Sequence, residues 1–191
     1  MKKFITMLLV AALSMSLASS VRAIEDPDPV GAITVGAHAS VFPGFGGNLF
    51  ADYVLIDSWW KGHFTVGGLL GFNTWSSTNT TGAMGYVLNT TVRANRFCVV
   101  PRATYGLNIL YNLEVHVGAQ AGIAYVASKA TVTDGNGVVL PTDTEDGDGV
   151  RLVVGGLAGA RYFFTDNFGA SLELNYGTYM PYINAGVAFR F

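Results

Sequence analysis

Apolar and polar residues alternate along most of this chain, and the alternation is clearest between residues 113 and 125. Every second residue from Leu113 to Tyr125 is apolar, and the residues between them are mostly polar or glycine. A period of two places the apolar side chains on one face of a β-strand. The stretches 64–73 and 168–177 repeat the pattern. Each of these segments is therefore predicted to be a strand with one apolar face and one polar face.

Less regular alternation extends the prediction to about eight strands. They cover residues 33–41, 49–56, 64–73, 97–105, 113–125, 152–164, 168–177 and 182–191. The connections alternate in length: residues 57–62, 107–112 and 165–167 form short turns on one side, and residues 43–48, 75–91, 127–149 and 178–181 form the connections on the other side. The two longest loops share that second side, which is typical of outer-membrane barrels.

The composition supports a membrane environment. Half of the residues are hydrophobic and only 13% are charged, yet no apolar run after the first 23 residues is long enough to span a bilayer as a helix. Alternating strands distribute apolar residues in this way, and only a closed barrel satisfies all strand backbone groups in hydrocarbon. We predict an all-β fold, a closed antiparallel transmembrane β-barrel of about eight strands in meander order over residues 32–191. The net charge of −2 does not favour nucleic acid.

The N-terminal residues have the three parts of an export signal. Lys2 and Lys3 precede an apolar core over residues 4–17, and small residues lead to Ala23. We predict a signal peptide over residues 1–23, cleaved between Ala23 and Ile24, and a short periplasmic leader over residues 24–31. The competing interpretation is a membrane anchor, but the core is shorter than the roughly 20 residues that a spanning helix needs. The predicted location is the bacterial outer membrane.

Six ionisable residues fall on the face of the strands that is predicted to line the lumen. They are Asp52, Arg102, Glu114, His116, Arg161 and Glu173. They form either the lining of a pore or an ion-pair network that plugs the barrel, and glycines on the same face leave room for long side chains. An eight-stranded barrel is barely wide enough for its own interior side chains, and unpaired buried charges are costly. We therefore favour the ion-paired plug.

Other candidate sites are weaker. The sequence His38-Ala-Ser40 resembles a pair found in lipid A deacylases, but both residues have lumen parity whereas those enzymes present the pair to lipid. His63 follows a predicted turn and is interpreted as an interface residue. The acidic run 143–148 lacks the distal bidentate glutamate of a calcium loop and is interpreted as a solvated loop. Cys98 is the only cysteine. We predict no enzyme activity, no cofactor and no metal site.

The last strand supplies a family resemblance. Val187, Phe189 and Phe191 share an apolar face that closes on the terminal aromatic residue, and the stretch 159–170 reads Gly-Ala-Arg-Tyr-Phe-Phe-Thr-Asp-Asn-Phe-Gly-Ala. These segments resemble the final hairpins of the small outer-membrane barrels that include the OmpA transmembrane domain and OmpX. The resemblance implies that Val187, Phe189 and Phe191 form an assembly signal read by the barrel insertion machinery. No peptidoglycan-binding domain follows Phe191, so a cell-wall tether is not expected.

These observations favour a structural or surface-interaction barrel with a plugged lumen. Its expected partners are outer-membrane lipid and lipopolysaccharide, the barrel assembly machinery during insertion, and an extracellular protein that binds the loop 127–149. In that loop, residues 131–133 and 138–140 flank Asp134-Gly-Asn-Gly and predict a hairpin. A small porin is the alternative function, and a lipid A-modifying enzyme is a weaker one.

Overall fold

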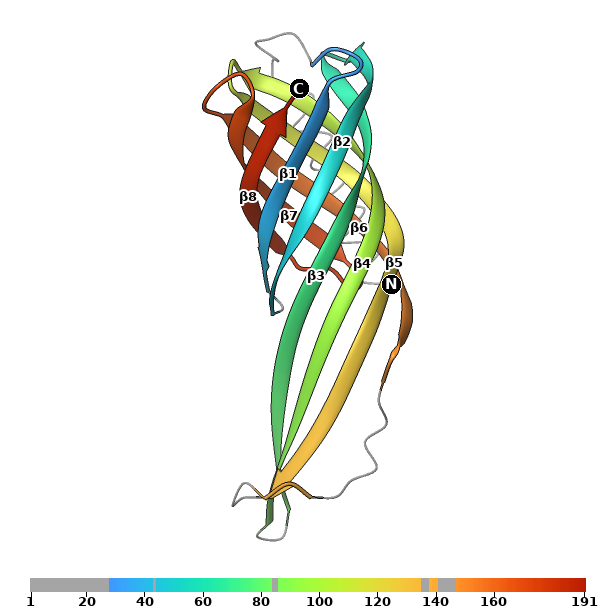
Figure 1. Ribbon diagram of the computed structural model, residues 1–191, viewed down its shortest axis with the longest axis vertical. Coiled ribbons are helices and arrows are strands. Elements are labelled where there is room, and N and C mark those ends of the chain that lie inside the picture. The colour runs from blue at the N-terminus through green and yellow to red at the C-terminus, as the bar shows by residue number, and fades with distance from the viewer. Residues whose placement is uncertain (1–27, 43, 84–85, 135–137, 141–146) are drawn as a thin grey trace.

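The computed structural model describes residues 28–191 except 43, 84–85, 135–137 and 141–146. These residues form an antiparallel barrel in meander order, and β1 pairs with β8 to close it (Figure 1). The strands are β1 Ile33–Val41, β2 Phe45–Trp59, β3 Gly62–Ala83, β4 Tyr86–Leu110, β5 Leu113–Asp134, β6 Gly149–Phe163, β7 Phe168–Gly177 and β8 Ile183–Arg190. The predicted fold class is confirmed. Among the described residues, no helix has the length and apolar character needed to cross a membrane.

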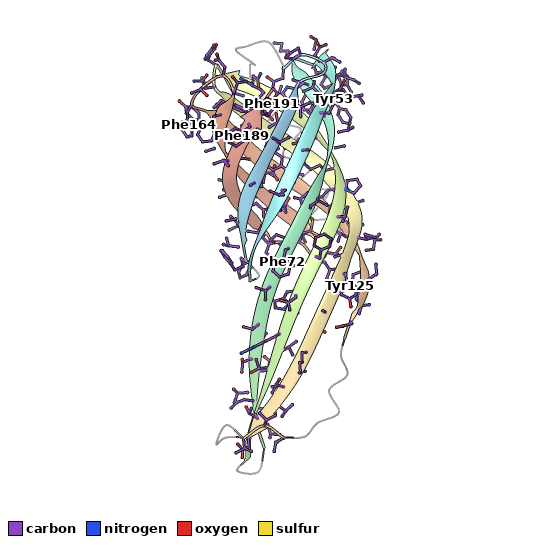
Figure 2. All side chains as sticks on the ribbon, in the orientation of Figure 1. Tyr53, Phe72, Tyr125, Phe164, Phe189 and Phe191 are labelled. Carbon is purple, nitrogen blue, oxygen red and sulfur yellow. The ribbon has the colours of Figure 1, made fainter. Side chains whose placement is uncertain are left out.

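The two faces of the strands differ as the alternation predicts. Leu70, Leu152 and Leu174 point outward and are at least half exposed. Aromatic side chains gather around both ends of this apolar surface. Figure 2 shows Tyr53, Phe164, Phe189 and Phe191 near one end and Phe72 and Tyr125 where the long strands leave the barrel. Such aromatic belts favour the interface between lipid and water.

The apolar zone has the height of a bilayer core. On β5 it runs from Leu113 to Tyr125, and 125 − 113 gives twelve steps of about 3.3 Å, or roughly 40 Å of strand. At the tilt of about 45° that is usual for membrane strands, this covers roughly 28 Å of depth. The outward face of β5 is therefore long enough to cross the hydrocarbon layer once.

The short turns lie together at the end of the barrel that we name the short-turn end, at the top of Figure 1. Between β2 and β3, Trp60 and Lys61 both have positive φ, 51° and 69°, as in the two-residue turns that match the twist of a hairpin. The Tyr105 hydroxyl donates hydrogen bonds to the carbonyl oxygens of Trp59 and Trp60. These bonds hold the turn against the neighbouring strand.

At the opposite end the structure corrects the sequence prediction. Residues 75–91, predicted to be a loop, belong mostly to β3 and β4, which stay paired as far as Ala83 and Tyr86. Residues 127–149 were likewise predicted to be a loop, but β5 continues to Asp134. Both faces of β3 are exposed over residues 76–82, so the alternation that marks a half-buried strand is lost. Threonine and valine, which favour strands, remain as the local signal.

These extensions form what we name the protruding sheet, residues 75–83 of β3, 86–95 of β4 and 127–134 of β5. The three strands extend well beyond the rest of the barrel (Figure 1). The pairing of β2 with β3 ends at Phe45 and Thr74, and the pairing of β5 with β6 ends at Val126 and Gly149. Within the part of the chain that the structure describes, β4 is thus the central strand, and β3 and β5 are the edges.

Candidate functional site: the ion-paired lumen

The barrel brings together all six ionisable residues that the sequence placed on the lumen face. Each is at most 4% exposed. They come from five strands: Asp52 from β2, Arg102 from β4, Glu114 and His116 from β5, Arg161 from β6 and Glu173 from β7. The alternation of each strand turns these side chains inward. The register then sets which of them lie side by side, because Glu114 is paired with Arg161 and Glu173 with Gly159.

Arg102 joins two carboxylates across the lumen. Its Nε and Nη2 donate to the two oxygens of Asp52 at 2.7 and 2.6 Å. Its Nη1 donates to both oxygens of Glu173 at 3.2 and 3.1 Å. The planar guanidinium suits this arrangement, since its five N–H groups form a rigid fork that matches carboxylate geometry. Arg102 therefore connects β2 to β7 through the centre of the barrel.

Arg161 extends the network to a third carboxylate. Its Nη2 donates to Asp52 Oδ2 at 2.5 Å and its Nη1 to Glu114 Oε1 at 3.3 Å. Both guanidinium groups also stack on Phe50, whose ring centre lies 4.6 Å from Cζ of Arg102 and 5.1 Å from Cζ of Arg161. The buried ring supplies a cation–π contact to each arginine and fills the lumen beside them.

The imidazole of His116 lies between the two glutamates. Its Nδ1 lies 3.3 Å from Glu114 Oε1 and its Nε2 lies 3.3 Å from Glu173 Oε1. A Cβ atom on Gly159 would collide with the imidazole, so the absence of a side chain there lets the ring occupy its place. In a low-dielectric interior such a set of ions is stable only when its members are paired. The geometry meets that condition for both arginines.

A second layer of the lumen is held by neutral hydrogen bonds. Ser40 Oγ donates to Asn184 Oδ1 at 2.6 Å, and Asn48 Nδ2 donates to Ser40 Oγ at 2.8 Å. His38 Nδ1 lies 3.1 Å from Asn48 Oδ1. His38 and Ser40 are thus buried inside the barrel, and each is bonded to an asparagine. This arrangement offers no support for a catalytic histidine–serine pair facing lipid.

Apolar side chains form a further layer. Leu69, Cys98, Val100, Ala124, Val153 and Met180 form a buried cluster. A cavity of about 10 Å³ lies beside it, lined in part by Asn48, Arg96 and Asn184. That volume holds about one water molecule. Apolar and polar side chains thus meet around this cavity.

Several lumen residues were not predicted from the sequence. His63 was interpreted as an interface residue, which is wrong: it is 1% exposed and its Nε2 lies 3.8 Å from Glu114 Oε1. It shares parity with Thr65 and Asn73 on β3, which are also buried, and this parity is the signal that would have placed it in the lumen. Arg96 shares parity with Arg102 and donates to Asn73 Oδ1. Asp28 precedes β1, and no periodic pattern marks it.

The structure places the remaining predicted sites as follows. Val187, Phe189 and Phe191 all point outward, with exposed fractions of 38%, 40% and 71%. Val138, Val139 and Leu140 approach the edge of β5, as the predicted hairpin requires: Leu140 N donates to Val132 O, and Asp134 N donates to Val138 O. The cleavage position at Ala23 and Ile24 lies outside the described residues, as does the acidic stretch 141–146, although Asp148 accepts a hydrogen bond from Ser128 N.

One family model and several solved structures are similar to this chain. A family model described as outer membrane protein beta-barrel domain matches residues 6–191. Similar solved structures include Ail, the attachment invasion locus protein of Yersinia pestis, at 16% identity, covering 85% of this chain and 100% of that one with a TM-score of 0.45. The N-terminal β-barrel domain of Pseudomonas aeruginosa OprF is 20% identical, covering 87% and 100% with a TM-score of 0.45. Neisserial surface protein A is 16% identical, covering 83% and 92% with a TM-score of 0.36.

No curated protein matches the chain. The family match spans nearly the whole sequence, so the chain belongs to the outer-membrane β-barrel family. The family resemblance noted at the last two hairpins is confirmed at this level, and the family implies a place in the bacterial outer membrane.

Proposed function

We propose that this outer-membrane barrel acts as a surface-interaction protein, with a lumen closed by side chains and a protruding sheet that binds an extracellular partner. The observation that carries the proposal is the continuation of β3, β4 and β5 beyond the barrel (Figure 1). From Tyr125 to Asp134, β5 advances nine residues, or about 30 Å of strand at 3.3 Å per residue. This length lifts the sheet out of the membrane, on the side opposite the short turns.

The edge formed by β3 is suited to pairing with another strand. Residues 76–82 of this edge read Ser-Ser-Thr-Asn-Thr-Thr-Gly and carry no charge. Native proteins usually blunt exposed edges with charged side chains, lysine above all. The edge of β5 differs, because residues 138–140 and Asp148 bond to part of it. The partner that fits the β3 edge is an extended segment of another protein, added as a further strand. The proposed binding surface is therefore the edge of β3, in place of the loop 127–149 that was expected from the sequence.

The outward face of the protruding sheet supports contact with lipopolysaccharide. Arg93 and Lys129 lie directly opposite each other on β4 and β5, four residues beyond the aromatic pair Phe97 and Tyr125 on the same face. Neither cation belongs to an ion pair among the described residues. Like charges facing each other across a sheet are unfavourable, so an anion between them would be stabilising. The phosphate groups of lipopolysaccharide are anions of this kind, and aromatic side chains such as Phe97 and Tyr125 favour the interface between lipid and water.

Two double variants that introduce lysine test whether the β3 edge binds the partner. Thr78 and Thr80 on the β3 edge face Thr91 and Asn89 on the central strand β4. The edge variant, Thr78→Lys with Thr80→Lys, puts two charges on the edge strand β3. The central variant, Asn89→Lys with Thr91→Lys, puts two charges at the paired positions on the central strand β4. Each pair of substitutions disrupts the same cross-strand hydrogen bonds, so the two variants are matched.

The measurement is the affinity of displayed peptides selected on the wild-type protein in lipid nanodiscs. We expect the edge variant to bind them at least tenfold more weakly and the central variant to bind them as the wild type does. Equal binding by both variants, or a failure to enrich any peptide, would refute the edge as the interaction surface.

Conductance in planar bilayers tests the closed lumen separately. We expect no steady single-channel steps from the wild-type protein, because buried ion pairs and an apolar cluster occupy the lumen. Steady single-channel conductance steps from the purified protein would refute the closed lumen and favour the small-channel alternative. That result would leave the proposal for the protruding sheet intact, since the two rest on different residues.

The proposal also covers export and insertion of the protein into the outer membrane. Residues 1–23 act as the export signal, cleaved between Ala23 and Ile24, and the outward-facing Val187, Phe189 and Phe191 are read by the barrel assembly machinery. Support comes from the three-part N-terminal pattern and from the exposure of all three C-terminal side chains.

A further inference from the structure

Three buried side chains from distant parts of the sequence meet inside the short-turn end of the barrel. Asp28 comes from the segment before β1, His63 from the start of β3 and Glu114 from the start of β5. One donor atom from each lies within 4.8 Å of the other two, and the three residues are 6%, 1% and 2% exposed. An imidazole and two carboxylates are the ligand types that proteins use for zinc and related divalent metals.

The neighbouring residues leave donor atoms of this cluster available. Glu114 is contacted by Arg161 through Oε1, while its Oε2 is buried without a hydrogen-bond partner among the described residues. His63 Nδ1 is also buried without one. Arg190 and Asn108 both donate to Oδ1 of Asp28. Leaving a buried polar atom unsatisfied is costly, so Glu114 Oε2 and His63 Nδ1 are available to a ligand.

The charge of the ion-paired network also favours an added cation. The ion pairs in and around the network involve four carboxylates, Asp28, Asp52, Glu114 and Glu173, and three guanidinium groups, Arg102, Arg161 and Arg190. With neutral imidazoles, 3 − 4 leaves one negative charge in excess within this ion-paired set. Arg96 is also buried in the lumen, but it donates to Asn73 and belongs to none of these ion pairs. A buried excess charge is unfavourable unless a counter-ion accompanies it. The excess lies in the network of which Glu114 is a member.

The space at the cluster is shaped for close approach of the ligands. A Cβ atom on Gly106 would collide with the imidazole of His63 and would lie 3.2 Å from Glu114 Oε1. His63 Nε2 and Glu114 Oε1 are 3.8 Å apart, whereas ligand atoms at 2.0 to 2.2 Å from one tetrahedral ion lie roughly 3.3 to 3.6 Å from each other. Small side-chain movements therefore suffice to close the site on an ion.

We propose that Asp28, His63 and Glu114 bind one divalent transition-metal ion, with Zn²⁺ as the ion that fits a histidine–carboxylate set best. The bound ion would tie the segment before β1 to β3 and β5, and so close the short-turn end of the lumen. No metal site was predicted from the sequence, because the three residues share neither a motif nor a strand. This inference is independent of the proposed role of the protruding sheet.

The test uses the full chain, refolded in metal-free lipid vesicles and titrated with ZnCl₂ by calorimetry, with Co²⁺ absorption as a probe of ligand geometry. We expect one Zn²⁺ per chain, a visible spectrum typical of four-coordinate Co²⁺, and a urea midpoint that rises with Zn²⁺ concentration. His63→Ala should weaken binding at least about 100-fold, since even residues behind the ligands change metal affinity 10- to 100-fold.

His38→Ala is the matched control. His38 is also a buried lumen histidine with an unpartnered Nε2, but it belongs to the neutral layer with Asn48, and its removal should leave Zn²⁺ affinity unchanged. Asp28→Asn provides a second variant, at a residue outside the strands, and it keeps a side-chain oxygen that can accept from Arg190 and Asn108. Heat-modifiability on gels verifies the fold of each variant.

Three results would overturn the proposal. The first is an absence of Zn²⁺ uptake at millimolar concentration, in which case the excess charge is balanced by a proton on an imidazole. The second is an equal loss of affinity in His38→Ala and His63→Ala. The third is binding that is unchanged in both His63→Ala and Asp28→Asn, which would place the metal elsewhere.

Discussion

The two halves of β4 carry the same residue type in opposite surroundings. Arg102 lies in the closed barrel, is 4% exposed, and donates four hydrogen bonds to Asp52 and Glu173. Arg93 lies in the protruding sheet, is exposed, and faces Lys129 across the strand pair. Closure of the sheet accounts for the difference, because it removes water from one face, so a buried cation must find its hydrogen-bond partners among the lumen side chains. In the open protruding sheet, an exposed cation such as Arg93 can be solvated by water and needs no protein partner.

Substitution of each arginine by glutamine would show the largest difference between the two halves. Arg102→Gln leaves Asp52 and Glu173 short of a buried partner, and breaking a buried pair in this way costs about 3 to 5 kcal/mol. Arg93→Gln is a surface change and should stay within about 0.5 kcal/mol. Urea titration in lipid vesicles measures both free energies of unfolding. Equal costs would mean that the lumen is hydrated and that closure does not isolate its charges.

A charge on the outward face should separate the halves of β5 almost as strongly. Val117 faces lipid within the barrel, so Val117→Arg should cost about 2 to 4 kcal/mol if the site is near the bilayer midplane. Thr131 has the same parity but lies in the protruding sheet, and Thr131→Arg should stay within about 0.5 kcal/mol. Gln120→Arg, on the lumen face, should be milder than Val117→Arg where glycines leave room. The same titration applies, and a large penalty at Thr131 would place that residue in the membrane.

Coupling between residues should distinguish the two regions at a smaller scale. In a double-mutant cycle, Asp52→Asn and Arg102→Gln together should cost less than the sum of the single changes, by about 0.5 to 3 kcal/mol. The corresponding cycle of Thr78→Ala and Thr91→Ala, which share an exposed 3.0 Å hydrogen bond, should show a smaller coupling. Additive behaviour of the lumen pair within error would argue against a network of mutually dependent ions.

The smallest effect on stability is expected at Phe191. The side chain is 71% exposed, so little of the roughly 1.5 to 3 kcal/mol for burying a phenylalanine is at stake. Its backbone pairs with Ile33 in both directions, and Phe191→Ala keeps these bonds. We expect a normal unfolding midpoint after refolding in vitro but a lower folded fraction in isolated outer membranes. A lost midpoint with a normal membrane yield would reduce the C-terminal pattern to ordinary strand packing.

Within the membrane, the sequence by itself determined the strands and their faces. Lipid on one side and a narrow lumen on the other impose a period of two, so the alternation alone assigns Glu114 and Val117 to opposite faces. The same rule would have placed His63 in the lumen had its parity been followed past the turn. In the protruding part of β3 the period of two is lost because both faces are exposed. Residues 75–83 were therefore predicted to be a loop, although their threonines favour a strand.

Tertiary structure alone decided which lumen residues meet. Alternation turns Asp52, Arg102 and Arg161 inward, but only the register of the ladders and the closure of β1 on β8 bring both arginines to one carboxylate. The convergence of Asp28, His63 and Glu114 depends on the path of a non-strand segment across the barrel end, which no local pattern encodes. Face assignment follows from the local environment of each residue, whereas contact across a barrel depends on the cumulative stagger of all its strands.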